Sequence, residues 1–394
     1  MAIAAWRGLV AAALFASVAW TSAVHALEPA AARGGLETAS AEAAGIDSTL
    51  LAALTRDIRA GKYPNIHSLL VVHHGKLGVE EYFEGADERR GEKVGTVRFD
   101  ADTLHDARSI TKSVTSIVFG IAVADHTIPD IDTPVLQFFP EYANLRTPER
   151  MAIRLRDLLS MTAGLQWDED SHPYGDPLNS ETAMDSAADP YRYVLEQPIV
   201  AERGRSFRYS GGNTLLLAAV IERATKMRLD EYARRVLFDP LGIDRYEWLK
   251  YPNGTPIAAS GLRLLPRDMA KLGLLYLNDG RWRGTQIVAE SWVRDSLSPH
   301  ATISDRPFGF QRYGYQWWLG SAHVGQSNVA WSAAVGWGGQ RILIVPSMDL
   351  VMVLTAGLYG DRRQTDITFE VLLDRVLPAV KAGASQPGAL AGNP

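Results

Sequence analysis

The chain has 394 residues, of which 46% are hydrophobic and 22% are charged, and its formal net charge is −5 at neutral pH. This composition is typical of a globular protein with one large domain or two ordinary ones, and the lack of a long basic run gives no indication of nucleic-acid binding or of a polybasic membrane surface. The chain contains no cysteine, which excludes disulfides, thiol nucleophiles and thiolate metal sites.

Residues 1–26 have the features of a cleavable signal peptide. Arg7 precedes an apolar run from Gly8 to Trp20, and the small residues Val24 and Ala26 form a typical cleavage site. We expect cleavage after Ala26, which predicts a periplasmic or secreted protein. The alternative is an uncleaved anchor, although the run is shorter than the roughly 20 residues that a membrane-spanning helix needs. No later stretch is long and apolar enough, so we expect no integral membrane span after cleavage.

Residues 27–125 predict the N-terminal part of an α/β domain. His73 and His74 are adjacent, so on a strand they point to opposite faces and are poor partners for one metal ion. We therefore expect no metal site. The elements predicted here are a helix capped by Asp47 or Ser48 and running to about Ala60, strands at 67–73 and 77–83 with a hairpin turn between them, a charged loop at 84–102 and a helix that starts near 109.

The helix that starts near residue 109 carries the pattern Ser109-x-x-Lys112. Apolar residues such as Ile110 and Val114 recur every three or four positions along it, and residues three apart share one helix face, so Lys112 sits one turn above Ser109. An amine beside a hydroxyl can activate a serine nucleophile. We expect burial to lower the pKa of Lys112, so that a neutral amine takes the Ser109 proton. The alternative is that Ser109 only caps the helix.

Residues 126–255 predict a mostly helical region. The pattern indicates helices at 153–161, 215–224 and 230–237, with Gly164 suited to a left-handed cap and Pro240-Leu241-Gly242 ending the last helix. Residues 171–189 form a long polar loop, and a loop of that length in a compact region is usually functional or disordered.

Tyr209 is the candidate for a second proton-transfer group. It lies among small residues, directly before a helix expected near Thr214. A tyrosine near ammonium groups can have its pKa lowered and act as an acid or a base. The alternatives are that Tyr209 is a packed aromatic residue and that the following pair, Gly211 and Gly212, only makes a turn.

Residues 256–394 predict the C-terminal part of the α/β domain. The segment Val335–Gln340 places three glycines at the head of a strand, where the backbone can approach another group closely. An N–H from this strand would complete an oxyanion hole with the N–H of Ser109. The elements expected here are helices at 266–278, 286–296 and 365–376 and strands at 315–319, 340–345 and 350–355. The whole order predicts an α/β (α+β) fold, in which a helical region is inserted into an antiparallel sheet flanked by helices.

Three segments in this order resemble the motifs of the serine β-lactamase and penicillin-binding-protein superfamily: Ser109-x-x-Lys112, Tyr209-Ser210-Gly211 and Trp337-Gly338-Gly339. The resemblance covers about residues 46–376 and looks closest to the class C β-lactamase-related branch, which holds esterases and 6-aminohexanoate-dimer hydrolases. It implies a β-lactamase/transpeptidase-like fold. It also implies Ser109 as nucleophile, Lys112 and Tyr209 as proton-transfer groups, and the N–H groups of Ser109 and Gln340 as oxyanion hole.

Two departures from the family pattern concern the substrate. Asparagine is usual in class C β-lactamases where this chain has Gly211, and lysine or histidine is usual where it has Trp337. That cation normally holds the carboxylate of a β-lactam, whereas tryptophan offers a flat apolar wall with one donor. The resemblance therefore favours ester or linear amide substrates. The residues expected to bind substrate are Trp337, Gly338, Gly339, Gly211 and Trp167, with the 171–189 loop.

The predicted function is a serine hydrolase that cleaves an ester or linear amide bond of a small molecule through an acyl-enzyme on Ser109. We expect neither a cofactor nor a metal to be required. The alternatives are a D-amino-acid peptidase, a weak β-lactamase or a non-catalytic ligand-binding module on the same scaffold. The sequence leaves the oligomeric state open.

Overall fold

The computed structural model describes residues 35–303 and 310–380, so the expected signal peptide at residues 1–26 lies outside it. Within the described residues the main sheet has nine strands, and all neighbouring strands are antiparallel except the short pair β1 and β3. This confirms the predicted antiparallel sheet built from both ends of the chain. In spatial order the strands are β1 (Glu37–Thr38), β3 (Lys76–Tyr82), β2 (Ile66–His73), β16 (Leu350–Ala356), β15 (Gln340–Val345), β14 (Ser327–Gly336), β13 (Trp318–Val324), β12 (Phe310–Tyr313) and β11 (Ala301–Thr302).

The central strands face two apolar cores, one on each side of the sheet. On β2, Leu70 and Val72 belong to one core, and Leu69 and Val71 belong to the other, as the two-residue period of a strand requires. Helices α2 (Ile110–Ala124) and α10 (Pro266–Leu277) contribute to the first core. Helices α1 (Ser48–Arg59) and α12 (Gln364–Phe369), with the π-helical turn at 370–376, contribute to the second. Both faces of the sheet are therefore covered by helices.

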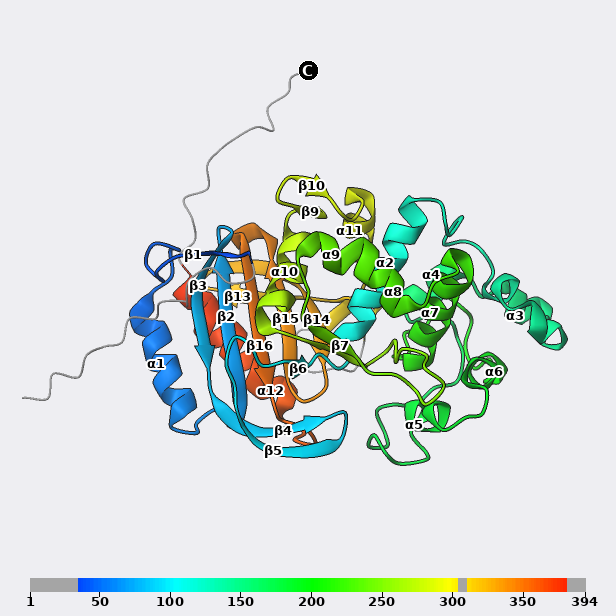
Figure 1. The fold of residues 1–394 in the computed structure, drawn as a ribbon, viewed down its shortest axis with the longest axis horizontal. Coiled ribbons are helices and arrows are strands. Elements are labelled where there is room, and N and C mark those ends of the chain that lie inside the picture. The colour runs from blue at the N-terminus through cyan, green and yellow to red at the C-terminus, as the bar shows by residue number, and fades with distance from the viewer. Residues whose placement is uncertain (1–34, 304–309, 381–394) are drawn as a thin grey trace, which may run out of the picture.

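A helical region lies beside the sheet, on the right in Figure 1, with α2 between the two. Helix α7 (Gly211–Thr225) packs on α2 and on α4 (Leu155–Leu159), which brings the start of α7 close to the start of α2. The other helices of this region are α3 (Pro148–Ala152), α5 (Ser180–Asp185), α6 (Pro190–Glu196), α8 (Leu229–Ala233) and α9 (Asp239–Leu241). Other small elements are the sheet β6 (His105–Asp106), β8 (Leu262–Leu264) and β7 (Tyr246–Trp248), the hairpin β9 (Arg281–Trp282) and β10 (Thr285–Gln286), and helix α11 (Glu290–Ser296). Short 3-10 or π-helical turns occur at Val135–Phe138, Pro140–Leu145, Arg234–Phe238, Pro346–Met348 and Leu377–Ala379.

The prediction of a charged loop at 84–102 is wrong. The segment forms an antiparallel hairpin, β4 (Glu84–Arg89) and β5 (Glu92–Arg98). Its two-residue turn is Arg90-Gly91, with positive φ at both positions (49° and 91°), which suits the right-handed twist of a tight hairpin. Because most of its side chains are exposed, the hairpin lacks the apolar alternation that usually reveals a strand.

Several predicted boundaries also change. The 171–189 loop contains α5, whose first turn is capped by the Asn179 side chain through the N–H groups of Glu181 and Thr182. Helix α7 starts at Gly211 rather than near Thr214, because Ser210 is its N-cap. The strand expected at 315–319 begins only at Trp318, and the helix expected at 286–296 begins at Glu290.

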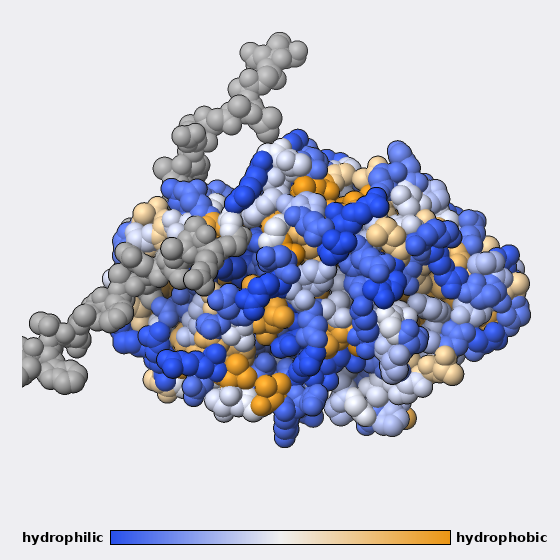
Figure 2. Space-filling view, viewed as in Figure 1, coloured by the Kyte–Doolittle hydropathy of each residue, from blue (hydrophilic) through white to orange (hydrophobic). Residues whose placement is uncertain are grey.

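The described ranges contain no helix with the length and apolar character needed to cross a membrane. The face shown in Figure 2 is predominantly hydrophilic, and its apolar side chains lie in small groups.

Candidate active site

Ser109 is the N-cap of α2, but its hydroxyl makes no capping hydrogen bond. The strand before it, β6, pairs with β8, and Ala107 N–H donates to Leu262 O at 2.9 Å, so the approach to the helix is fixed. Arg108 has a left-handed backbone conformation (φ 49°), which is uncommon outside glycine and turns the chain sharply into α2. The Ser109 hydroxyl therefore does not cap the helix, and its oxygen is available for a reaction.

Helix α2 is held in place by its own hydroxyl groups. Ser113 donates to Gln316 O at 2.7 Å, Thr115 to Ala258 O at 3.0 Å and Ser116 to Tyr315 O at 2.8 Å. These bonds satisfy polar groups on a helix that is buried around most of its circumference. They also tie α2 to two loops, so the position of Ser109 is set by rigid surroundings.

Lys112 lies beside Ser109, as the three-residue spacing predicts. Its ammonium nitrogen is 3.1 Å from Ser109 Oγ and 3.2 Å from Ala259 O, and the side chain is only 1% exposed. The same nitrogen is 3.7 Å from Glu181 Oε2 and 4.9 Å from the centre of the Tyr209 ring. Lys112 therefore bridges the candidate nucleophile, the tyrosine and a buried carboxylate.

Tyr209 reaches the same place from the residue before the Ser210 cap of α7. Its ring packs against Trp318, with ring centres 5.4 Å apart, and its hydroxyl takes part in hydrogen bonds with Ser109 and Lys112. The structure thus brings together Ser109, Lys112 and Tyr209, which are separated by up to 100 residues in the sequence.

The expected direction of the two pKa shifts is wrong. Burial alone lowers the pKa of Lys112, but the Tyr209 oxygen and the carboxylates of Glu181 and Glu169 outweigh burial, so the pKa is raised above that of an ordinary lysine. Burial raises the pKa of Tyr209, and the Lys112 ammonium offsets this only in part. The Tyr209 oxygen thus raises the pKa of Lys112 and the Lys112 ammonium lowers that of Tyr209, so each group stabilises the charged form of the other.

Two buried glutamates were missed by sequence reasoning. Glu169 accepts hydrogen bonds from Trp167 Nε1 and from the Gly211 N–H, both at 2.5 Å, and from the Tyr174 hydroxyl at 3.1 Å. Glu181, on α5, accepts from the Ser260 hydroxyl at 3.0 Å. Neither glutamate stands in a recognisable motif, and only the packing of α5 and the Trp167 loop against α2 and α7 brings them to Lys112.

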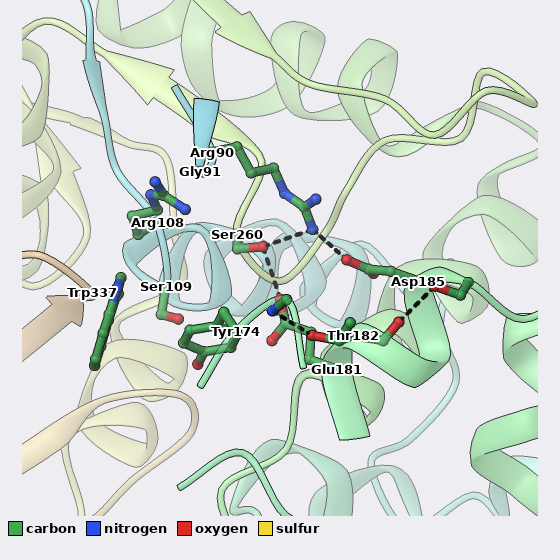
Figure 3. A pocket seen from close by; sticks show the side chains of 12 residues that line it. Arg90, Gly91, Arg108, Ser109, Tyr174, Glu181, Thr182, Asp185, Ser260 and Trp337 are labelled. Atoms are coloured by element: carbon green, nitrogen blue, oxygen red, sulfur yellow. Dashed lines mark hydrogen bonds and ion pairs between the residues drawn. The ribbon is translucent and has the colours of Figure 1, made fainter. Parts of the chain in front are cut away.

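Ser109 opens into a cleft of about 410 Å³ between the sheet and the helical region. In Figure 3, Trp337 and Tyr174 stand on either side of Ser109, and their rings are in edge-to-face contact with centres 5.6 Å apart. The far wall carries Arg90, which pairs with Asp185 at 2.7 Å. The residues that line the cleft are Arg90, Gly91, Arg108, Ser109, Tyr174, Gly175, Glu181, Thr182, Asp185, Ser186, Ser260 and Trp337.

The Trp337–Gly339 segment is the loop between β14 and β15. Gly338 and Gly339 have positive φ (84° and 102°), and a β carbon on Gly338 would lie 2.3 Å from the Tyr359 ring, so this tight turn requires glycine. Both glycines pack away from the cleft, which only Trp337 of this loop lines. Gln340 begins β15, and its side-chain amide bonds to the Ala356 backbone. The oxyanion role of its N–H stays a prediction.

Two other predicted substrate-binding residues lie outside the cleft lining. Trp167 is buried behind Glu169 and contacts Gly212, where a β carbon would lie 2.7 Å from its ring. Gly211 is also buried, and a β carbon there would lie 2.5 Å from Glu181 Oε2 and 3.1 Å from Glu169 Oε1. Both residues shape the space around the two glutamates.

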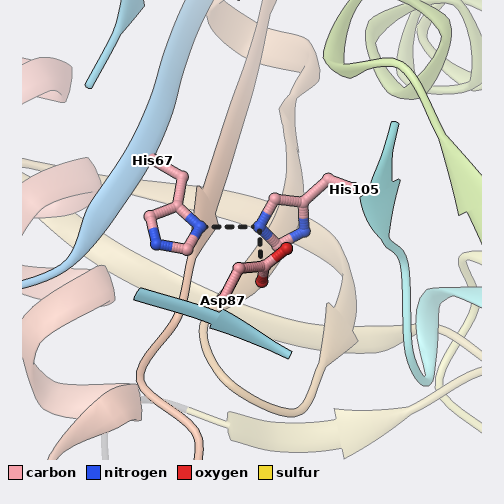
Figure 4. A group of neighbouring side chains, drawn as sticks. All are labelled: His67, Asp87 and His105. Carbon is pink, nitrogen blue, oxygen red and sulfur yellow. Dashed lines mark hydrogen bonds and ion pairs between the residues drawn. The ribbon is translucent and has the colours of Figure 1, made fainter. Parts of the chain in front are cut away.

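His67, Asp87 and His105 form a separate buried cluster, and His105 lies on β6, the strand that precedes Ser109 (Figure 4). His67 Nδ1 and His105 Nε2 are 2.8 Å apart, which is a hydrogen-bond distance; two nitrogens bound to one tetrahedral Zn²⁺ would be about 3.3 Å apart. Burial lowers the pKa of His67 to about 2, so this ring is neutral. We interpret the cluster as a hydrogen-bonded support for β6.

Comparison with solved structures places the fold in a known class. A family VIII carboxylesterase has a TM-score of 0.61 at 17% identity, covering 84% of this chain and 97% of the other. An octameric penicillin-binding protein homologue from Pyrococcus abyssi has a TM-score of 0.59 at 18% identity, covering 82% and 76%. The architecture is therefore that of the β-lactamase and penicillin-binding-protein fold.

The family model described as Beta-lactamase matches residues 56–374, most of the chain, and the protein belongs to the beta-lactamase family. A 6-aminohexanoate-dimer hydrolase from Paenarthrobacter ureafaciens is 26% identical over 275 residues, which make up 65% of this chain. The matched region spans 66% of that relative, just under two thirds of its length. These findings confirm the family resemblance seen in the sequence motifs.

Proposed function

We propose that this protein is a serine hydrolase that cleaves an ester or linear amide bond of a small molecule through an acyl-enzyme on Ser109. The observation that carries the proposal is the Ser109 hydroxyl, which does not cap α2 but lies 3.1 Å from Lys112 Nζ, is hydrogen-bonded to Tyr209 and faces a cleft. The similarity to a 6-aminohexanoate-dimer hydrolase and to a carboxylesterase supports it. A panel of ester and amide substrates distinguishes between the two kinds of bond.

In the proposed reaction, Ser109 Oγ attacks the carbonyl carbon while its proton passes to the Lys112 and Tyr209 pair. The N–H groups of Ser109 and Gln340 stabilise the tetrahedral oxyanion, and one such donor typically contributes about 3–4 kcal/mol. The leaving group departs with a proton from Tyr209, and water then hydrolyses the acyl-enzyme. No step requires a cofactor.

The cleft supports a small polar substrate. A volume of about 410 Å³ lies within the range of small-molecule sites, roughly 300–1,000 Å³. Tyr174 and Trp337 provide a flat apolar contact next to Ser109, while the Arg90–Asp185 pair and the Ser260 hydroxyl make the opposite wall polar. We infer that the scissile bond lies against the two rings beside Ser109 and that the polar part of the substrate reaches towards Arg90.

A fluorophosphonate probe tests whether Ser109 is the nucleophile. A panel of p-nitrophenyl esters and linear amides tests which kind of bond the protein cleaves. We expect the probe to form one covalent adduct, on the peptide that contains Ser109, and to block hydrolysis of the panel. Peptide mapping by mass spectrometry measures the first result, and released p-nitrophenol or amine measures the second. Absence of both the adduct and hydrolysis would contradict the proposal and favour a ligand-binding module.

Hydrolysis of nitrocefin is expected to be slow or absent compared with p-nitrophenyl butyrate. Trp337 provides no cation for the β-lactam carboxylate, and the two arginines of the cleft are already paired, Arg90 with Asp185 and Arg108 with Asp106 at 3.1 Å. The ratio of the two kcat/KM values is the measurement. A nitrocefin value equal to or above the ester value would show that Trp337 does not exclude β-lactams.

A further inference from the structure

Two backbone segments from distant parts of the chain meet beside Ser109. One is the turn at residues 107–109, which leads into α2, and the other is the loop at residues 337–339 between β14 and β15. They touch, because a β carbon on Gly336 would lie only 2.3 Å from Ala107 O. A misplacement of about 1 Å at a reacting group can cost on the order of 100-fold in rate. The separation of the two segments must therefore be held fixed.

The first segment contains a strained residue that needs support. Arg108 has a positive φ of 49°, and such a backbone costs on the order of 1–3 kcal/mol in a residue other than glycine. Its guanidinium is held by Asp106, 3.1 Å away, and by Glu88, 3.7 Å away. It also lies over the ring of Tyr359, 4.7 Å from the ring centre, which is a favourable cation–π distance. Tyr359 thus supports the residue directly before Ser109.

The second segment packs against the same ring. A β carbon on Gly338 would lie 2.3 Å from Tyr359 Cε1 and 2.4 Å from Tyr359 Cδ1, so the ring leaves no room for a side chain there. The Gly338 backbone is bound from the same part of the chain. Its N–H donates to Gln364 Oε1 at 2.6 Å, and its carbonyl accepts from the Leu358 N–H at 2.9 Å. The connection from β16 to α12, residues 357–363, therefore lies behind the 337–339 loop.

Tyr359 is itself anchored at both ends. Near its backbone, the Gly357 N–H donates to Asn65 O at 2.9 Å, and Gly357 O accepts from Asn65 Nδ2 at 2.7 Å. Its hydroxyl donates to Asp87 Oδ1 at 3.4 Å, which is long for a hydrogen bond. Asp87 belongs to the buried cluster shown in Figure 4. The ring is therefore a fixed surface against which both segments rest.

We propose that Tyr359 is a positioning residue for Ser109: by contacting Arg108 and Gly338 with one ring, it sets the separation of the 107–109 turn from the 337–339 loop. The inference rests on the proposed function. Among the described residues, Tyr359 is not one of those that line the cleft, so it acts through Ser109 and Trp337, which do.

The test measures how fast a fluorophosphonate labels Ser109. Tyr359→Ala removes the ring and is expected to slow labelling about 10- to 100-fold. Tyr359→Phe keeps the ring and loses only the long hydroxyl contact, so it is expected to keep most of the rate. Tyr63→Ala is the matched control. Tyr63 is buried, has Arg375 over its ring at 5.7 Å and does not line the cleft, so this variant is expected to label like the unaltered protein.

Gly338→Ala tests the same contact from the other side. The added methyl group is expected to displace the Tyr359 ring and to slow labelling. Gly75→Ala is the control for backbone strain. Gly75 also has a positive φ (72°), but a β carbon there would meet no described atom within 4 Å, so labelling is expected to be unchanged. The double variant of Tyr359→Ala and Gly338→Ala is expected to lose less than the product of the two single losses, because the ring that the methyl group would displace is absent.

Thermal melts establish which variants are folded, and Gly338→Ala provides the test if Tyr359→Ala does not fold. The inference is overturned if folded Tyr359→Ala labels at the wild-type rate, if Tyr63→Ala is slowed as much, or if the losses in the double variant multiply. These results would leave the proposed function intact as long as the unaltered protein is labelled and hydrolyses the panel. An unaltered protein that does neither contradicts the proposed function, and the inference with it.

Discussion

Replacing Ser109 with alanine is expected to lower kcat for p-nitrophenyl butyrate by a factor on the order of 10⁴ to 10⁶, because the acyl-enzyme cannot form and only the oxyanion donors and substrate binding remain. A 10⁶-fold loss corresponds to about 8 kcal/mol of transition-state stabilisation. Stability should change little, since the Ser109 hydroxyl does not cap α2. Initial rates and a thermal melt measure the two effects.

Ser113→Ala is the matched control, because it removes the same group one turn further along the same helix. Its hydroxyl bonds to Gln316 O, so the variant is expected to lose about 1–3 kcal/mol of unfolding free energy while keeping its kcat. If Ser109→Ala retained a substantial fraction of wild-type kcat, or if Ser113→Ala lost as much, Ser109 would not be the nucleophile.

Replacing Lys112 with methionine is expected to lower kcat by a factor on the order of 10² to 10⁴, since the side chain of similar length can no longer move a proton. It also leaves Glu181 buried without its main counter-charge, which costs about 3–5 kcal/mol of unfolding free energy. Without this cation the pKa of Glu181 rises, so the cost is smaller at low pH, where the carboxyl takes up a proton more readily, and grows as the pH rises. Rates and melts at about pH 5 and about pH 8 measure both effects.

Lys271 provides a control for the loss of a buried ammonium. It is 1% exposed, lies 2.8 Å from Asp268 Oδ1 on α10 and is not one of the residues that line the cleft. Lys271→Met should lose stability in the same way and keep its kcat. Equal losses of activity in Lys271→Met and Lys112→Met would show that the Lys112 effect is only structural.

The sequence predicted those parts of the fold that have an apolar period. Strands β2, β15 and β16 and helices α2, α7 and α10 are buried on one or more faces, and their side chains carry that pattern. The hairpin β4–β5 was missed because a strand with exposed side chains has no such period. Short elements such as α5 were missed because one cap, Asn179, is a weaker signal than a repeat.

The candidate site was predictable only where its residues are close in sequence or belong to a motif. Ser109 and Lys112 are three residues apart on one helix, so their contact follows from helix geometry. Tyr209 and Trp337 were placed by family resemblance. No local sequence pattern marks Glu169 or Glu181 as part of the site, because the role of a buried carboxylate depends on its partners on other elements.

That omission explains why the pKa prediction for Lys112 had the wrong sign, whereas for Tyr209 the effect of burial was left out. Burial alone does lower the pKa of a lysine, and the prediction considered burial and the serine. The carboxylates of Glu181 and Glu169, together with the Tyr209 oxygen, reverse the direction for Lys112. The net charge around a buried group decides its ionisation, and that charge is a property of the tertiary structure.

Gly211 constrains the order in which mutations can reshape this site. The asparagine that class C β-lactamases usually have at this position would put its β carbon 2.5 Å from Glu181 Oε2, so the Glu181 carboxylate would have to move to admit it. Shortening Glu181 first would deprive Lys112 of its counter-charge. Position 211 and Glu181 are therefore coupled, and each is expected to constrain the substitutions that the other tolerates.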